Sequence, residues 1–394
     1  MLPYNKEMNF LQYFGLLLFP ILLINLLEIS SFPGDVKDVG RFTIEYVLYL
    51  SAIILLIYTI IYFGKLYNNL IKFKHIYFSL GILGVIYLIS HFQNENYVEN
   101  TTLLYLFLTF TLTIIFINVQ WTPNHVVSFG HIVNFFVLFL FLHWFVLDFP
   151  IGKFKSVFWN PNGLGIATFC LLFFQIIAIK YVHFGFKIYF MIFILMNLIV
   201  LYSTTSRAVF LALILVLASM LTYKLFNSMF SKLYFVVLPF VLIFVYFYVT
   251  LVNTSFGKQL NELSLKYFSK SFFSGRSELW EAIWQVGLKQ PIFGHGIGLQ
   301  PKEVTEFTLS SHNQYLQVFL ETGFLGLIAF CILLFFIWKA LLKNSHTYVG
   351  AWSACFFIGI LFYQSMEYSL FINNLSLSYL QWLIITIGIS FNER

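Results

Sequence analysis

Residues 233–252 read LYFVVLPFVLIFVYFYVTLV, and Asn253 then opens a polar stretch that continues to Ser310. An apolar run of about 20 residues is the length that an α-helix needs to cross a bilayer. Comparable runs lie near residues 9–30, 44–64, 76–91, 102–120, 129–147, 163–179, 188–203, 208–223, 321–338, 348–368 and 374–390. The sequence therefore predicts an all-α polytopic membrane protein with about twelve transmembrane helices.

The composition excludes a soluble domain. Hydrophobic residues make up 60% of the chain and charged residues only 10%, which is too little polar surface to cover a water-facing fold. The first run lacks a small-x-small cleavage site before Asp35, so we interpret it as the first span and not as a secretory signal. Cys170, Cys331 and Cys355 fall inside predicted spans without metal-ligand spacing, so we predict neither disulfides nor a metal site.

The formal charge of +6 does not indicate a nucleic-acid partner, because the basic residues are dispersed at helix ends. If the N-terminus is cytoplasmic, the loops on that side hold Lys6, Lys65, Lys72, Lys74, Lys180, Lys187, Lys224, Lys232, Lys339, Lys343 and Arg394. The short loops on the other side hold only Lys37, Arg41, Lys153, Lys155 and Arg207. The positive-inside rule therefore predicts cytoplasmic termini and an external segment 253–310.

The chain is expected to form one helical membrane domain with one large insertion. Residues 1–252 are predicted to hold spans one to nine, residues 253–310 an external loop, and residues 311–394 the remaining three spans. Within the loop, Ser277 is predicted to cap a helix that Pro291 ends. Trp280 and Trp284 recur on one face of that helix, which predicts that it lies in the membrane interface.

Two arginines on the predicted outer side are candidates for binding an anion. Arg207 follows the hydroxyl residues 203–206 at a span boundary, where a guanidinium can bind a phosphate with paired hydrogen bonds. It could equally be an interface arginine that reaches out of the bilayer. Arg276 comes directly before the predicted helix start, whose free N–H groups favour anions.

Histidines and one acidic residue complete the candidates. Residues 294–298 read GHGIG but lack the Lys-Ser/Thr pair of a phosphate loop, so we interpret the glycines as a turn and leave His295 as structural or functional. His312 follows Ser310 and Ser311, which could cap the next helix and favour a neutral imidazole. Such a histidine could be a general base or a structural residue. Glu367 could belong to a proton pathway, but we favour a position near the outer interface.

Several of these residues occur in an order typical of one family. The motifs are Asn160-Pro161-Asn162, Ser206-Arg207, Ser274-Gly275-Arg276 with Trp280, Pro291-Ile292-Phe293-Gly294-His295-Gly296, and His312-Asn313 with Glu321-Thr322-Gly323 and Gly326. In this order the chain resembles the O-antigen ligase and Wzy-type polymerase superfamily from Asn160 to Gly326. The preceding spans are similar only in hydrophobicity.

The resemblance implies a GT-C-like membrane glycosyltransferase that acts on the outer face of the bacterial cytoplasmic membrane. It implies a glycan on undecaprenyl diphosphate as donor, a glycan or lipid as acceptor, and no metal, nucleotide sugar or other cofactor. Arg207 and Arg276 match the family's paired arginines, which would hold the diphosphate, and His312 would deprotonate the acceptor hydroxyl. The remaining residues that we assign to substrate binding are Asn162, Lys289, His295 and Asn313.

Within the superfamily, polymerases join lipid-linked repeats to one another, and ligases transfer a finished glycan to a separate acceptor such as lipid A-core. Ser274-Gly275-Arg276 followed by Trp280, together with a single histidine before Asn313, favours the polymerase. A flippase and a chain-length regulator are the implied protein partners. A polysaccharide flippase is the rival class, but it should show related halves and charges at mid-bilayer, and neither is clear in this sequence.

Overall fold

The computed structural model describes residues 10–393, except for Pro33, residues 95–99, 269–270, Ser274 and residues 372–373. Helices make up the described fold, with no named strand in these ranges. They are α1 (Phe10–Ile24), η1 (Asn25–Ile29), α2 (Gly34–Ile61), α3 (Phe63–Lys72), α4 (Lys74–Gln93), α5 (Asn100–Asn118), α6 (Pro123–Val146), α7 (Pro161–Ala178), α8 (Phe184–Ser203), α9 (Arg207–Leu225), α10 (Asn227–Phe230), α11 (Leu233–Leu251), α12 (Ser255–Phe268), α13 (Arg276–Gly287), α14 (Pro301–Val304), α15 (Gln314–Asn344), α16 (Tyr348–Tyr363) and α17 (Leu375–Ser390).

The predicted spans are confirmed as helices. In the described ranges, 10 helices are long and apolar enough to cross a membrane, and α16 and α17 are shorter apolar helices. Several helix boundaries differ from the apolar runs, since α2 begins at Gly34, α6 at Pro123 and α15 at Gln314. Polar caps and first turns set where a helix starts, whereas hydropathy marks only its apolar part.

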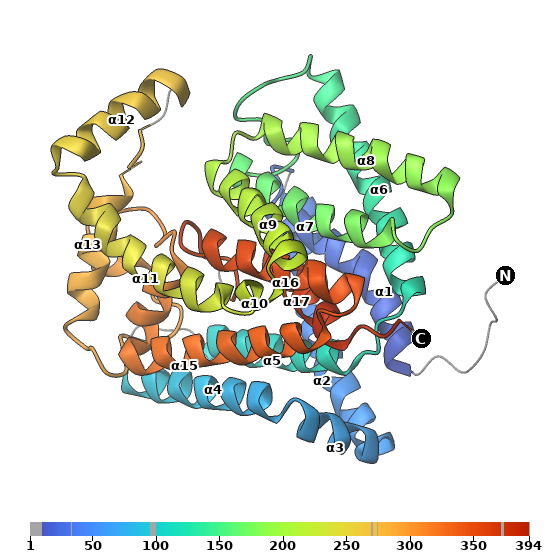
Figure 1. The fold of residues 1–394 in the computed structure, drawn as a ribbon. Helices are drawn as coiled ribbons and strands as arrows, with labels where there is room; N and C mark the ends of the chain where they lie inside the picture. The colour runs from blue at the N-terminus through green and yellow to red at the C-terminus, as the bar shows by residue number, and fades with distance from the viewer. Residues whose placement is uncertain are drawn as a thin grey trace.

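The C-terminal helices lie at the centre of the bundle. Nearly every side chain of α16 and α17 is buried, as are most of those of α7. In Figure 1, α16 and α17 lie between α9 and α15. The outer helices α2, α8, α9 and α11 expose long apolar side chains instead, as expected where a helix meets lipid.

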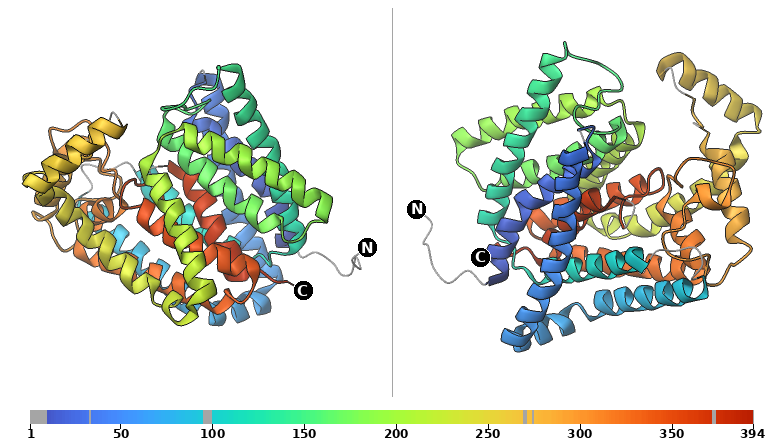
Figure 2. Two further views of the ribbon diagram at one scale, coloured as in Figure 1. Left: turned by 45° about the horizontal axis from the view of Figure 1, so that its top comes forward. Right: turned by 180° about the vertical axis from the view of Figure 1, so that it is seen from behind.

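The bundle has two distinct ends. At one end, which we call the terminal end, Asn392 N donates to Trp121 O over 2.8 Å and Gln12 near the start of α1 bonds Gln120 O over 3.1 Å. At the other end, which we call the site end, lie α12, α13 and the loop after α16 (Figures 1 and 2). The helix α12 was not predicted from the sequence.

A break divides α15 into two half-helices. Gly323 has φ 65° and ψ −163°, which are not helical values. The segment 291–298 packs into the break, where Phe324 N donates to Pro291 O over 2.7 Å. An added Cβ at Gly323 would lie 2.6 Å from the Pro291 oxygen, so the close approach requires glycine.

The side chain of Glu321 holds the glycine-rich segment against the broken helix. Its Oε1 accepts hydrogen bonds from Gly298 N at 3.0 Å and from Gln317 Nε2 at 2.9 Å, and its Oε2 accepts from Tyr87 in α4 at 3.0 Å. Gly294, Gly296 and Gly298 have φ of 71°, 107° and 81°. The interpretation of these glycines as turn residues is confirmed, and Glu321 is the buried anchor of the turn.

Candidate active site

Glu367 joins three helices at the site end. It lies in the loop between α16 and α17. Its Oε2 is 2.7 Å from His312 Nδ1, and its Oε1 accepts from Arg276 Nη2 at 2.9 Å and from Asn162 Nδ2 at 3.0 Å. The carboxylate therefore links the starts of α7, α13 and α15, which are far apart in the sequence.

These contacts fix the ionisation of Glu367. Burial by itself would raise the pKa of this carboxyl, but its charge interactions and hydrogen bonds with His312 and Arg276 outweigh that effect and lower the pKa to about 2. A carboxylate of this kind stays ionised at physiological pH and can accept hydrogen bonds only. The side chain is 15% exposed, so it sits just beneath the surface that a substrate would meet.

His312 is held in an unusual backbone conformation. Its φ is 45°, a left-handed value that is uncommon for residues other than glycine and that clusters at functional sites. The next residue, Asn313, caps α15 by accepting from Tyr315 N and Leu316 N at 3.0 Å. On the other side, Trp280 Nε1 donates to Ser311 O over 2.8 Å. Neighbours on both sides thus fix the imidazole next to Glu367.

One prediction about this region is wrong. Asn313, and not Ser310 or Ser311, supplies the side chain that caps α15. Asn313 is also fully buried, with Oδ1 used by the cap and Nδ2 donating to Ser365 O over 2.9 Å. Asparagine is a strong N-cap residue because its short amide reaches the free backbone N–H groups. The side chain of Asn313 therefore positions His312, and its polar atoms are already engaged within the protein.

Arg276 is the first residue of α13. Gly275 precedes it with φ 72°, a conformation that favours glycine. The guanidinium of Arg276 donates from Nη1 to Met366 O over 2.7 Å as well as from Nη2 to Glu367. Its side chain is 16% exposed, so the remaining N–H groups are close to the surface. A guanidinium held in this way can present two N–H donors to a phosphate.

The helix α13 differs from its prediction at two points. Ser277 lies inside the first turn and does not cap the helix, which has Gly275 at the N-cap position. Trp280 is fully buried and packs 4.8 Å from the ring of Tyr248 in α11, so it does not lie in the membrane interface. Helical periodicity identifies an apolar face but cannot distinguish protein from lipid as the partner of that face.

Arg207 begins α9 and reaches towards the same end of the bundle. Its Nη1 donates to Ser264 Oγ of α12 over 3.0 Å, and its Nη2 donates to Ser271 O over 3.1 Å. Arg276 lies close enough for the two positive charges to interact. The structure thus brings the two predicted arginines into one electropositive region.

Asn162 lies in the first turn of α7 and contributes to the cluster through Glu367. The other two predicted binding residues lie apart from it. His295 Nε2 is 2.8 Å from Val286 O, within the turn that Glu321 anchors. Lys289 is exposed just beyond the C-terminal end of α13, about 20 Å along the helix from Arg276.

The sequence did not predict that Glu367 lies at the centre of the candidate site. Its only signal was an acidic residue next to an apolar run, which we interpreted as lying near the interface. An acid in that position is costly unless it is paired.

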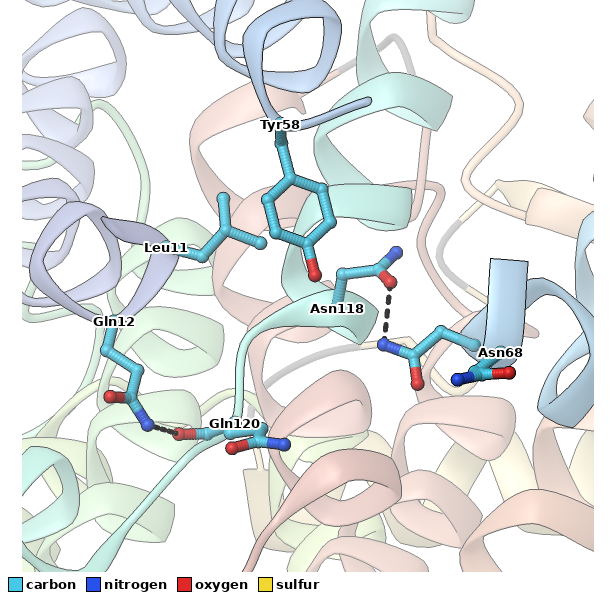
Figure 3. Close-up of a pocket in the computed structure, with 7 residues that line it drawn as sticks. Leu11, Gln12, Tyr58, Asn68, Asn118 and Gln120 are labelled. Atoms are coloured by element: carbon cyan, nitrogen blue, oxygen red, sulfur yellow. Dashed lines mark hydrogen bonds between the residues drawn. The ribbon is translucent and has the colours of Figure 1, made fainter. Parts of the chain in front are cut away.

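A cavity at the terminal end lies far from these groups in the fold. It has a volume of about 170 Å³ and is lined by Leu11, Gln12, Tyr58, Asn68, Asn69, Asn118 and Gln120. Figure 3 shows that amide side chains surround it, with Gln12 bonded to Gln120. Among its lining residues only Tyr58 is ionisable, so it lacks the acid–base pair found at the site end.

Comparison with known families finds a match that overlaps the range of the motifs. Residues 190–331 match the family model described as O-antigen ligase. No curated protein sequence matches the chain. The matched range contains Arg207, Arg276 and His312 but ends before Glu367. The resemblance to the O-antigen ligase and Wzy superfamily is therefore confirmed over this range, and its members are glycosyltransferase-like membrane enzymes.

Proposed function

From the O-antigen ligase match over residues 190–331, we propose that the protein polymerises undecaprenyl-diphosphate-linked oligosaccharide repeats into a surface polysaccharide. The observation that carries the proposal is the carboxylate of Glu367, which lies 2.7 Å from His312 Nδ1 and accepts a hydrogen bond from Arg276 Nη2 over 2.9 Å. A base and an anion-binding group are the two elements that glycosyl transfer from a lipid diphosphate needs. Here the base, His312, and the anion-binding group, Arg276, both contact the carboxylate of Glu367.

The proposed reaction follows from this arrangement. Glu367 accepts a hydrogen bond from the Nδ1–H of His312, which leaves the lone pair of Nε2 free to take the proton of the acceptor hydroxyl. The acceptor oxygen then bonds to the anomeric carbon of the donor as its bond to the diphosphate oxygen breaks. Negative charge develops on the leaving diphosphate, and preplaced guanidinium groups at Arg207 and Arg276 stabilise that charge.

The choice between polymerase and ligase rests on sequence features, namely the Ser274-Gly275-Arg276 motif followed by Trp280 and the single histidine before Asn313. The cluster around Glu367 would serve either reaction, because the same charge develops on the diphosphate in both. Only the acceptor differs. A ligase is therefore the second candidate, and the test must vary the acceptor.

We expect purified protein in proteoliposomes to convert an undecaprenyl-diphosphate-linked repeat into a ladder of longer lipid-linked chains. A polymerase finds both donor and acceptor in this one substrate, so nothing else needs to be added. Gel electrophoresis of labelled lipid-linked product measures the ladder. The His312→Ala protein serves as the inactive control.

Transfer that appears only after a separate acceptor lipid is added would establish the ligase in place of the polymerase. Movement of the intact lipid-linked repeat across the bilayer, with no change in glycan length, would instead identify a flippase. The three outcomes are measured on the same proteoliposomes, so they can be compared directly.

We propose further that the protein lies in the bacterial cytoplasmic membrane with both termini cytoplasmic and residues 253–310 external. The support is the excess of lysine and arginine in the loops of the terminal end. In this orientation the cluster around Glu367 faces outward. A metal is not needed in the proposed reaction, and a chelator should leave the rate unchanged.

The orientation is tested with single cysteines. Lys258→Cys in α12 and Lys302→Cys in α14 should react with a membrane-impermeant maleimide in intact cells, whereas Lys72→Cys at the end of α3 should react only after lysis. The unsubstituted protein, with Cys170, Cys331 and Cys355, gives the background. Labelling of Lys72→Cys alone in intact cells would reverse the orientation and place the cluster in the cytoplasm.

A further inference from the structure

A cavity of about 360 Å³ lies beside the first turn of α7 at the site end. Its lining includes Glu28, Lys37, Trp159, Asn160, Gly163 and Asn374. It adjoins the cluster around Glu367 through α7, because Asn160 lines the cavity and Asn162, two residues later, bonds the carboxylate. Two residues correspond to about 3 Å along a helix axis. The volume is within the range of small-molecule sites, roughly 300 to 1,000 Å³.

The cavity presents an aromatic ring. The side chain of Trp159 is 65% exposed. Its backbone N–H donates to Ile29 O over 2.8 Å, which ties the residue to η1. The Nζ of Lys37 lies 4.3 Å from the centroid of the indole ring. This cation–π contact helps to fix the orientation of the ring, so a broad apolar surface is held at the mouth of the cavity.

Hydrogen-bond donors and acceptors surround the ring. Glu28 contributes a carboxylate that accepts one hydrogen bond, from Ser376 Oγ at 3.3 Å. Asn160 and Asn374 cap α7 and α17 with their Oδ1 atoms, which accept from Gly163 N at 2.7 Å and Leu377 N at 3.3 Å. The described residues offer no acceptor to the two Nδ2 groups. The cavity therefore has hydrogen-bond donors and acceptors available around an apolar ring.

We infer that this cavity binds a pyranose ring of the glycan, one sugar removed from the reacting centre. A pyranose has an apolar C–H face that can pack on an indole, and hydroxyls that can donate to Glu28 and accept from the amide groups. A diphosphate fits less well, because Glu28 would repel it. The inference rests on the proposed function and adds a subsite that selects the sugar sequence of the substrate.

An interfacial anchor is the alternative explanation for an exposed tryptophan. An anchor would sit among lipid-facing apolar side chains, whereas Trp159 shares a cavity with a carboxylate, an ammonium and two amides. A carboxylate such as Glu28 facing lipid would be costly. The polar lining therefore favours a hydrated cavity that accepts a sugar.

The subsite is tested by kinetics with two variants. Trp159→Ala should raise the KM for the lipid-linked repeat about 10-fold while kcat changes little, because the lost contact is remote from the reacting atoms. Gly163→Ala should also raise KM, since its Cβ would lie in the cavity at an ordinary 3.5 Å from Asn160 Oδ1. The matched control is Phe256→Ala, which removes another exposed aromatic ring from the site end. Initial rates of ladder formation give both constants.

A second measurement separates the subsite from the proposed function. The oligosaccharide released from the lipid-linked repeat by mild acid is titrated against purified protein by calorimetry, and we expect binding that Trp159→Ala weakens about 10-fold. Binding with this dependence, in a protein that makes no ladder, would retain the subsite and refute the polymerase. A normal ladder with unchanged KM in both variants, or no oligosaccharide binding by the unsubstituted protein, would overturn the subsite and identify Trp159 as an anchor only.

Discussion

Glu367→Gln should lower the rate of glycan transfer by about 10⁴-fold, the effect of an equivalent carboxylate-to-amide change in Ser-His-Asp enzymes. Arg276 Nη2 and Asn162 Nδ2 are both donors to Oε1, so the amide oxygen of glutamine should face them. The amide NH₂ must then face His312 Nδ1 and donate to it. His312 would carry its proton on Nε2, where it cannot accept one from the acceptor hydroxyl.

The measurement is the rate of ladder formation by matched amounts of folded protein. The control Glu306→Gln changes an exposed carboxylate at the site end and should leave the rate unaltered. In a protein that already carries His312→Ala, Glu367→Gln should lower the rate little further, because the effects of substituting residues that act as one unit are not additive. Equal fractional losses in both backgrounds would show that Glu367 acts independently of His312.

The pH dependence of stability provides a second readout for Glu367. Its folded-state pKa is lowered from 4.5 to about 2, so its ionised form stabilises the fold fully above the unfolded value. That contribution is lost as the pH falls through the window between the two values. The difference in thermal stability between the unsubstituted protein and Glu367→Gln should therefore shrink below about pH 4.5.

The spans could be predicted from the sequence because the bilayer imposes a length and an apolar composition on each one. The residues 233–252 correspond to α11 within a residue of its end. The ends of helices were less predictable. Asn313 caps α15 in place of the serines before it, since which of several capping residues is used depends on the backbone that follows.

The arrangement of the site was predictable only in part. From the motif order we predicted that Arg207, Arg276 and His312 belong to one site. The structure places them at one end of the bundle. Glu367 could not be assigned from the sequence, because its three partners come from helices distant in the chain. Trp280 was misplaced for a related reason, since its partner Tyr248 is a tertiary neighbour.

Arg276→Ala should lower kcat by about 10²- to 10³-fold, the usual cost of removing one preorganised donor from a transition state. Arg276→Lys should recover little of this loss. A single ammonium cannot bond Met366 O and Glu367 while also giving two donors to a phosphate. The matched control is Lys258→Ala, which removes an exposed positive charge from α12. Rates are measured at saturating lipid-linked repeat.

Product inhibition separates a direct role of Arg276 in binding diphosphate from an indirect role through Glu367. If the guanidinium holds the diphosphate, Arg276→Ala should weaken inhibition by undecaprenyl diphosphate, whereas Glu367→Gln should leave that inhibition nearly unchanged. An arginine that only supports Glu367 would give both variants the same inhibition as the unsubstituted protein. The Glu367 contact at 2.9 Å makes the comparison necessary, because removing the guanidinium also takes one positive charge from the carboxylate that orients His312.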